Sequence, residues 1–333
     1  MKKKIIQALK IAVSLGLGVG LIVWFVRQLS DEDLQTIRGA FMRADYLWIM
    51  LAPFIGTISN ISRARRWIML LEPTGHKPGF VNTFCSVIIM YFFNMLFPRL
   101  GEVTRCTILA RYEKVPLDKS IGTMVVERVV DMFSLLAVGA ILMIIESDRL
   151  LTFYRAKGWR DPSQTPQEGD TVNWIIYAGI ILLVIAALFY MQRRYGLAKL
   201  KQMIKNRMVG FIEGVKSIRY VRNPWEFTFH SLFIWFCYYL MLQLSFPALD
   251  ETAKLGVSPA LACLFFGGFA MVATPGGIGA YPLAIAKVLA LYGIMESVGY
   301  ALGSLIWVAQ VGVILLGGGI CLIILALMNR EPE

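Results

Sequence analysis

Long apolar runs, rich in Leu, Ile, Met and Ala, recur along this chain of 333 residues and limit what it can fold into. Several runs approach the ~20 residues that a helix needs to cross a bilayer. Hydrophobic residues make up 57% of the chain, whereas soluble domains contain roughly 45–50%. Because lipid offers the backbone no hydrogen bonds, only helices and closed barrels cross a membrane. The length and composition of the runs favour helices, so we predict an all-α integral membrane protein.

The net charge of +11 would indicate a nucleic-acid partner in a soluble protein. Here the basic residues lie in loops beside apolar runs, where they orient the spans and contact anionic lipid. We therefore predict membrane lipids as partners and no nucleic acid. The five cysteines lie in or beside apolar runs without metal-ligand spacing, which favours packing roles. We expect no metal and no cofactor.

The positions of basic residues predict the topology. Lys2, Lys3 and Lys4 place the N-terminus in the cytoplasm, and no cleavage site follows the first apolar run, so we expect an uncleaved helix. The basic, amphipathic segment 191–226 is expected on the cytoplasmic leaflet. About six crossings would put both termini in the cytoplasm and make 1–333 a single polytopic domain. The predicted full spans are about 8–29, 46–61, 120–145, 172–190, 227–246 and 298–327.

The segment 80–112 does not fit this count as a full span, because basic residues flank both of its ends. Asn94, Pro98 and Gly101 interrupt its apolar pattern near the middle. A re-entrant hairpin resolves the conflict: one half-helix enters the membrane, the chain turns near Pro98, and a second half-helix returns. Such broken backbone is tolerated at membrane depth only where protein or water surrounds it.

A second break interrupts 258–294 at Pro275, Gly276, Gly277 and Gly279. We interpret it as a second hairpin that enters from the outside. Two full spans would preserve the count equally well, so the charge pattern leaves both arrangements open. Inverted hairpins that meet at mid-membrane, with substrate held at the breaks, occur in many transporters. The likeness of the two breaks therefore favours an inverted repeat.

The predicted span 120–145 carries Glu127, Arg128 and Asp131. Charges at this depth are costly unless they are paired or hydrated. Glu127 and Asp131 share one helix face, and Arg128 is spaced to pair with Asp131. Two interpretations stay open. The charges are either a structural network that fixes the span to a neighbour, or the wall of a hydrated cavity that binds a proton or cation.

Arginines gather near the first break and at the ends of predicted spans. Their forked side chains suit phosphate, and the commonest phosphate near a bilayer belongs to lipid. The alternative is ordinary arginines at the membrane interface. We predict that a lipid headgroup phosphate is bound by Arg63, Arg66, Arg99, Arg105 and Arg128. The residues that would balance this charge, or bind a proton or cation, are Glu102, Glu127 and Asp131.

Several other polar residues receive no role from the sequence. The positive-inside rule explains Arg65, and His76 and His230 show no partner pattern. Lys287 would need a partner or water. No nucleophile elbow, P-loop, zinc-binding HExxH or dinucleotide fingerprint is present. We therefore predict no catalytic residue.

Three motifs together resemble a known family. They are Asn94-x3-Pro98-x2-Gly101-Glu102-x2-Arg105, then Glu127-Arg128-x2-Asp131, then Pro275-Gly276-Gly277-Ile278-Gly279. In this order and spacing they are similar to the lysylphosphatidylglycerol synthase transmembrane region, which includes the membrane half of the multiple peptide resistance factor. The resemblance covers about 10–328. Where the family often follows the second break with a glutamate, this chain has Ala280-Tyr281-Pro282.

The resemblance implies a lipid flippase in the bacterial cytoplasmic membrane. In fused family members a cytosolic transferase makes the lipid that the membrane half moves. This sequence contains no such synthase, so a separate lipid-modifying enzyme is among the expected partners, and a homo-oligomer stays open. We expect a non-enzymatic transporter of an anionic, aminoacylated or polyprenyl-phosphate lipid. The alternatives are an integral-membrane lipid-modifying enzyme and a non-catalytic partner subunit.

Overall fold

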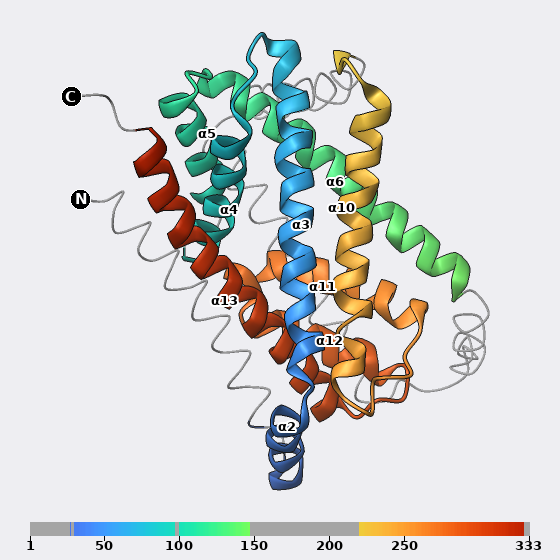
Figure 1. Cartoon of the computed structure of the whole chain (residues 1–333). Coiled ribbons are helices and arrows are strands. Elements are labelled where there is room, and N and C mark those ends of the chain that lie inside the picture. The colour runs from blue at the N-terminus through green and yellow to red at the C-terminus, as the bar shows by residue number, and fades with distance from the viewer. Residues whose placement is uncertain (1–26, 28–29, 97–99, 147–219, 330–333) are drawn as a thin grey trace, which may run out of the picture. The chain divides into compact units, whose positions relative to one another are not determined.

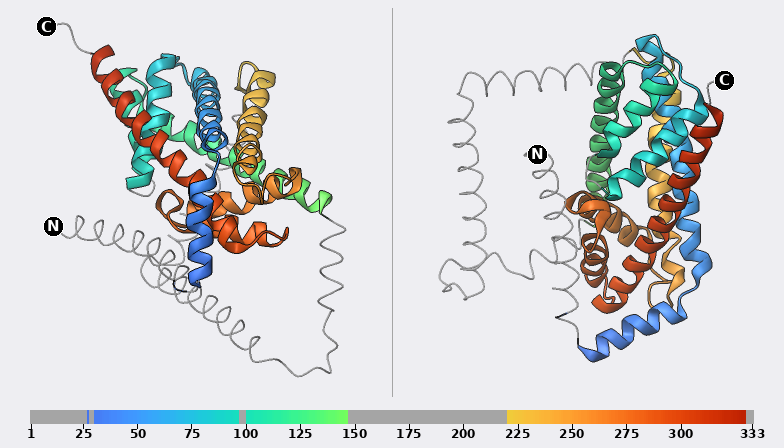
Figure 2. Two further views of the ribbon diagram at one scale, coloured as in Figure 1. Left: turned by 60° about the horizontal axis from the view of Figure 1, so that its bottom comes forward. Right: turned by 90° about the vertical axis from the view of Figure 1, so that its left-hand side faces the viewer.

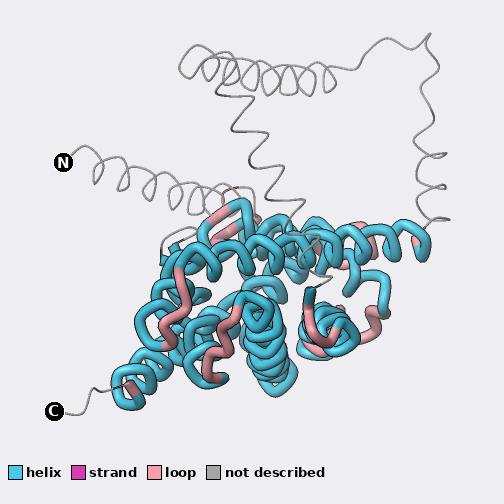
Figure 3. Tube along the Cα trace, turned by 90° about the horizontal axis from the view of Figure 1, so that it is seen from above, coloured by secondary structure: helices cyan, strands magenta, loops and turns pink. Residues whose placement is uncertain are grey.

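Helices make up all regular structure in the part of the chain that the computed structural model describes, which is residues 27, 30–96, 100–146 and 220–329 (Figure 1). Figure 3 shows these helices joined by loops. The all-α prediction is therefore confirmed for these residues. The α-helices are α2 (Asp31–Arg43), α3 (Tyr46–Leu71), α4 (Phe80–Leu96), α5 (Leu100–Tyr112), α6 (Leu117–Ile145), α10 (Pro224–Gln243), α11 (Val257–Ala273), α12 (Ala280–Ala290) and α13 (Glu296–Met328). The short 3-10 helices are η1 (Glu72–Thr74), η3 (Phe246–Ala248) and η4 (Pro275–Gly277).

Three segments among the described residues are long and apolar enough to cross a membrane: α6, α10 together with η3, and α13. They correspond to the predicted spans 120–145, 227–246 and 298–327. Apart from residue 27, the predicted spans 8–29 and 172–190 lie outside the described residues, as does most of the segment 191–226. The count of six crossings and the side of each terminus remain predictions.

Helix α3 corrects the predicted boundary of the span 46–61. It continues ten residues further, to Leu71, so Arg63, Arg65 and Arg66 lie inside the helix. The predicted span 46–61 placed these arginines just beyond its end, on the cytoplasmic side. Arg63 and Arg66 instead lie buried against acidic partners, and that pairing allows the helix to continue.

The first predicted break separates α4 from α5, and the two helices pack against each other. Pro98 itself lies outside the described residues. The Asn94 side-chain oxygen accepts the Gly101 backbone N–H at 2.9 Å. A Cβ atom at Gly101 would lie 2.0 Å from the Met90 carbonyl oxygen. Glycine is therefore required for this close approach of the two helices.

The second predicted break is present between α11 and α12. Gly276, Gly277 and Gly279 have positive φ angles of 58°, 76° and 72°, a conformation that favours glycine. The Trp307 indole N–H of α13 donates to the Gly276 carbonyl at 2.7 Å and so holds the turn. Helix α12 has only 11 residues, which extend about 16 Å. That length favours the hairpin over two full spans.

The second break lies beside the end of α4. A Cβ atom placed on Gly276 would be 3.5 Å from the Met95 Cα atom and 3.4 Å from its side chain. Helix α13 runs alongside both α12 and α4 (Figure 2). The C-terminal part of α4 and the turn at η4 are thus neighbours, as expected if the two interrupted segments meet.

The buried residues around α3, α4, α5 and α6 form an apolar shell that includes Trp67, Met90, Leu109 and Val126. All five cysteines are buried and free of disulfides, in keeping with packing roles. Large apolar side chains such as Phe133 on α6 remain exposed. Exposed apolar faces of this kind suit contact with lipid rather than water. The chain also contains a second unit, Met143–Lys216, nearly all of which lies outside the described residues.

Candidate functional site

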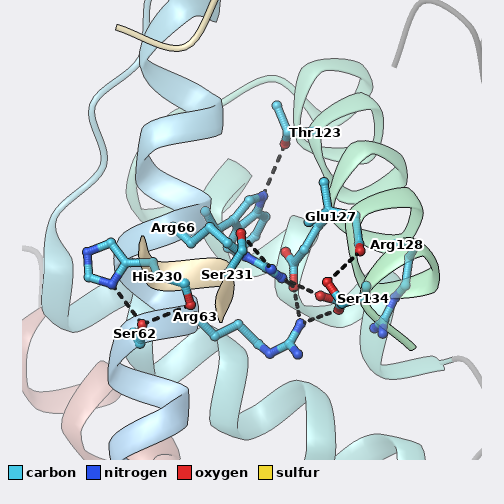
Figure 4. A network of polar contacts seen from close by, with 12 residues as sticks. Ser62, Arg63, Arg66, Thr123, Glu127, Arg128, Ser134, His230 and Ser231 are labelled. Atoms are coloured by element: carbon cyan, nitrogen blue, oxygen red, sulfur yellow. Dashed lines mark hydrogen bonds and ion pairs between the residues drawn. The ribbon is translucent and has the colours of Figure 1, made fainter. Parts of the chain in front are cut away.

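Helices α3 and α6 each present two charged residues to the other. Arg63 and Arg66 lie one turn apart on α3, as do Glu127 and Asp131 on α6. Arg63 donates to Glu127 and, at 2.8 Å, to Asp131. Arg66 donates to the second Asp131 oxygen at 2.7 Å and lies 3.5 Å from Glu127. Figure 4 shows the side chains of Arg63, Arg66 and Glu127 converging between the two helices.

Arg105 reaches the same site from α5. Its guanidinium donates to the free oxygen of Glu127 at 2.8 Å. The guanidinium carbon lies 4.2 Å from the ring centroid of Trp67, a favourable cation–π arrangement. The Trp67 indole N–H donates in turn to the Thr123 hydroxyl at 3.0 Å, which fixes the ring beneath Arg105.

Helix α10 closes the site with two neutral groups. The Arg63 guanidinium donates to the Tyr238 hydroxyl at 3.0 Å, and Arg66 donates to the Ser231 hydroxyl at 3.4 Å. Four helices, α3, α5, α6 and α10, therefore share one buried polar site. We refer to its charged residues, Arg63, Arg66, Arg105, Glu127 and Asp131, as the ion cluster.

The ion cluster is unbalanced in charge. Three guanidinium groups, from Arg63, Arg66 and Arg105, meet the two carboxylates of Glu127 and Asp131, so one positive charge is in excess. Arg66, Arg105 and Glu127 are 0% exposed. Burial of an unbalanced charge is costly. The arrangement therefore favours an additional anionic group at the site.

Several donors of the ion cluster lack partners among the described residues. The Nε atoms of Arg63, Arg66 and Arg105, and the Nη1 atom of Arg105, are buried without a hydrogen-bond acceptor. Leaving a buried donor unpaired costs about 1–3 kcal/mol. Arg105 thus has two unused donors on one guanidinium. An oxyanion could accept from them while it balances the excess charge.

Arg128 and Glu102 form a separate ion pair at 3.1 Å next to the ion cluster. The sequence spacing suggested that Arg128 pairs with Asp131, and this was wrong. Consecutive residues on a helix point about 100° apart, so Arg128 reaches Glu102 on α5, while Glu127 points into the ion cluster between α3 and α5. Asp131 is taken by the two arginines of α3 instead.

The predicted site residues therefore fall into three groups. The structure brings Arg63, Arg66, Arg105, Glu127 and Asp131 together, with Glu102 and Arg128 beside them. Arg99 lies outside the described residues. Asn94, Gly101 and the glycines of the second break shape the two turns. Lys287, expected to need a partner, forms an ion pair with Glu296 at 2.6 Å.

Sequence reasoning missed Trp67, Ser231 and Tyr238. One signal was available, because Ser231 and Tyr238 are seven residues apart and share a face of an apolar helix. Sequence reasoning also gave no role to Ser62 and His230, although the Ser62 hydroxyl lies 2.7 Å from the His230 Nδ1 atom. A single polar residue in an apolar span does not reveal which residue it will contact. The sequence therefore did not predict this contact between α3 and α10.

Residues 7–318 match the family model described as the lysylphosphatidylglycerol synthase TM region. The chain belongs to this family. A UPF0104 membrane protein of Methanocaldococcus jannaschii is similar to it, with 29% identity over 87 residues. That match spans 25% of this chain and 26% of the archaeal protein. No solved structure matches the chain. Family membership and the apolar helices together show a membrane protein.

Proposed function

We propose that this protein is a lipid flippase that moves a lipid with a phosphate headgroup between the leaflets of the membrane. The observation that carries the proposal is the ion cluster, where three buried arginines face two carboxylates and leave donors unpaired. Membership in the lysylphosphatidylglycerol synthase transmembrane family supports a role in lipid handling. The interrupted segments support a path for the headgroup, since transporters hold substrate where helices break.

A lipid phosphodiester fits the chemistry of the ion cluster. It carries a single negative charge, which equals the excess positive charge of the three arginines over the two carboxylates. Arginine donates strong, charge-assisted hydrogen bonds to phosphate, and the Nε and Nη1 atoms of Arg105 have no acceptor among the described residues. The carboxylates of Glu127 and Asp131 hold the arginines apart and in position. In this proposal they do not bind the phosphate.

The proposal also covers the membrane in which the protein works and the lipid that it moves. The protein would work in the bacterial cytoplasmic membrane with both termini in the cytoplasm. It would move an anionic, aminoacylated or polyprenyl-phosphate lipid without changing it covalently. If the transported lipid is a modified one, a separate lipid-modifying enzyme would make it.

The proposal is tested by transfer of a fluorescent phosphatidylglycerol between leaflets of liposomes that contain the purified protein. The Arg105→Gln variant should slow transfer about tenfold to hundredfold, because it removes a charged donor worth about 1.5–3 kcal/mol. Arg43→Gln is the matched control, since Arg43 forms an exposed ion pair with Glu251 at 3.2 Å. It should transfer lipid like the wild type.

Two results would count against the flippase. One is that the folded wild-type protein does not accelerate the transfer of any phosphate-bearing lipid between the leaflets. The other is a folded Arg105→Gln variant that is as fast as the wild type. Chemically altered lipid in the same vesicles would favour the enzyme alternative, so the lipids are also analysed by mass spectrometry.

A further inference from the structure

A second polar group lies on the α3–α10 interface beside the ion cluster (Figure 4). The Ser62 hydroxyl contacts the Nδ1 atom of His230 at 2.7 Å. The other ring nitrogen of His230 lies 3.8 Å from the Glu226 Oε1 atom. Arg65 donates to the same oxygen of Glu226 at 3.1 Å. Both nitrogens of one imidazole therefore face polar groups inside a predicted span.

His230 is not sealed inside the protein. Its side chain is 18% exposed, and it lines a hollow of about 310 Å³ between α3, α10 and the start of α4. Arg65 lies at the same hollow, with its side chain 43% exposed. The hollow is lined by Ile58, Ile61, Ser62, Arg65, Phe80, Phe229, His230 and Phe233. His230 and Arg65 therefore both lie at one hollow whose other lining residues are mostly apolar.

The contacts of Ser62 suit both protonation states of His230. In the neutral imidazole, Nδ1 accepts the hydrogen bond of the Ser62 hydroxyl. In the imidazolium both ring nitrogens are donors, so the Ser62 oxygen must accept and its hydrogen must turn elsewhere. The His230 backbone carbonyl lies 3.4 Å from the same hydroxyl and can take that hydrogen. The interface therefore contains partners for an added proton.

Protonation of His230 would change the pairing of Glu226. The charged groups that act on His230 among the described residues are Glu226 on its own helix and Arg65 and Arg66 on α3, while α4 contributes Phe80 to the hollow. An imidazolium attracts the Glu226 oxygen that Arg65 now holds. Arg65 is the more exposed partner and can leave. It would then be free to bind an anion at the rim of the hollow.

The same two helices hold the ion cluster. Ser231, next to His230, accepts from Arg66, and Arg63 follows Ser62 directly along α3. A change in the contacts of Ser62 and His230 therefore acts on the helices that position Arg63 and Arg66. Neighbouring residues on α3 and α10 therefore connect His230 with the ion cluster, which is the proposed headgroup site.

We propose that His230 is a proton-binding site whose protonation releases Arg65 from Glu226 and so favours binding of a lipid phosphate. The lipid half of this inference rests on the proposed function, whereas the proton site does not. Because linkage is reciprocal, bound lipid phosphate must favour protonated His230 by the same factor.

The chain has only two histidines, His76 and His230, which makes a direct test practical. The protein is labelled with 15N-histidine in maltoside micelles, which contain no phosphate, and its imidazole signals are titrated by NMR. His76→Gln assigns the signals. The signal of His230 should show a protonation step within the pH range in which the protein stays folded. Adding phosphatidylglycerol should move its midpoint to higher pH, by about one unit for a tenfold coupling.

His76 serves as the internal control for surface charge, because anionic lipid also raises the proton concentration near every exposed histidine. The shift at His230 should exceed the shift at His76, and it should vanish in Arg65→Gln. A His230 signal that never titrates would overturn the proposal. An equal shift at both histidines, or an undiminished shift in Arg65→Gln, would overturn the coupling to lipid.

Transport measurements separate this inference from the flippase proposal. Transfer of phosphatidylglycerol by the wild type should depend on pH, and His230→Gln should remove that dependence while His76→Gln keeps it. Transfer that is independent of pH in the wild type would contradict the proton site and leave the flippase standing. Absent transfer with an intact His230–lipid coupling would contradict the flippase and leave the binding site standing.

Discussion

Arg105 differs from the other two arginines of the ion cluster in what holds it. It has a single close carboxylate contact, to Glu127 at 2.8 Å, and the Trp67 ring lies beneath it. Arg63 and Arg66 each contact both carboxylates. Arg105 also has two unpaired donors where the others have one. It is therefore the arginine best placed to bind an additional anion.

Glu127 should be the residue whose neutralisation costs most stability. It contacts all three arginines of the ion cluster and is fully buried. Glu127→Gln leaves the buried arginines with one carboxylate, which should lower the free energy of unfolding by about 3–5 kcal/mol. Equilibrium unfolding in mixed micelles measures the change.

The matched control for this prediction is Glu251→Gln, which removes the carboxylate of the exposed Arg43–Glu251 pair. Surface pairs contribute about 0–1 kcal/mol, so this variant should unfold almost like the wild type. Equal losses in the two variants would mean that the ion cluster does not hold the helices together.

Helices and their interruptions were the part of this molecule most open to prediction. Spans such as 120–145 follow from apolar length, and the break at Gly276 follows from residues that stop helices locally. The partners of the charges were not predictable. Arg128 pairs with Glu102, and Asp131 pairs with two arginines of α3. Sequence spacing allows several acidic partners for one arginine, and only the packing of the helices decides which of them is near.

The turn between α4 and α5 should depend on the absence of a side chain at Gly101. A Cβ atom there would meet the Met90 carbonyl oxygen at 2.0 Å, so Gly101→Ala forces the two helices apart. Destabilisation of about 1–3 kcal/mol or more is expected for such overpacking. Equilibrium unfolding in mixed micelles measures the change.

Gly122 on α6 gives the matched control for this substitution. A Cβ atom there meets nothing within 4 Å, and replacing glycine within a helix by alanine stabilises it by about 0.5–1 kcal/mol. Gly122→Ala should therefore be neutral or slightly stabilising. A Gly101→Ala variant as stable as Gly122→Ala would show that the helices do not pack as described.

For the molecule as a whole, the described helices place two interrupted segments together and bury an ion cluster among four helices. Gly276 lies against Met95 at the end of α4, and α5, which follows the first break, supplies Arg105 to the cluster. The helix that follows the first break, α5, thus carries one of the charges of the ion cluster. Helix α5 therefore links the first break to the proposed headgroup site through Arg105.

The central claim is that the excess charge of the ion cluster selects phosphate, and discrimination between two lipids tests it most directly. Liposomes with the wild-type protein are assayed for leaflet transfer of phosphatidylglycerol and of a neutral glucosyl diacylglycerol. The account predicts that phosphatidylglycerol moves at least about tenfold faster, and that Arg105→Gln removes this preference. Equal acceleration of both lipids by the wild type would contradict it.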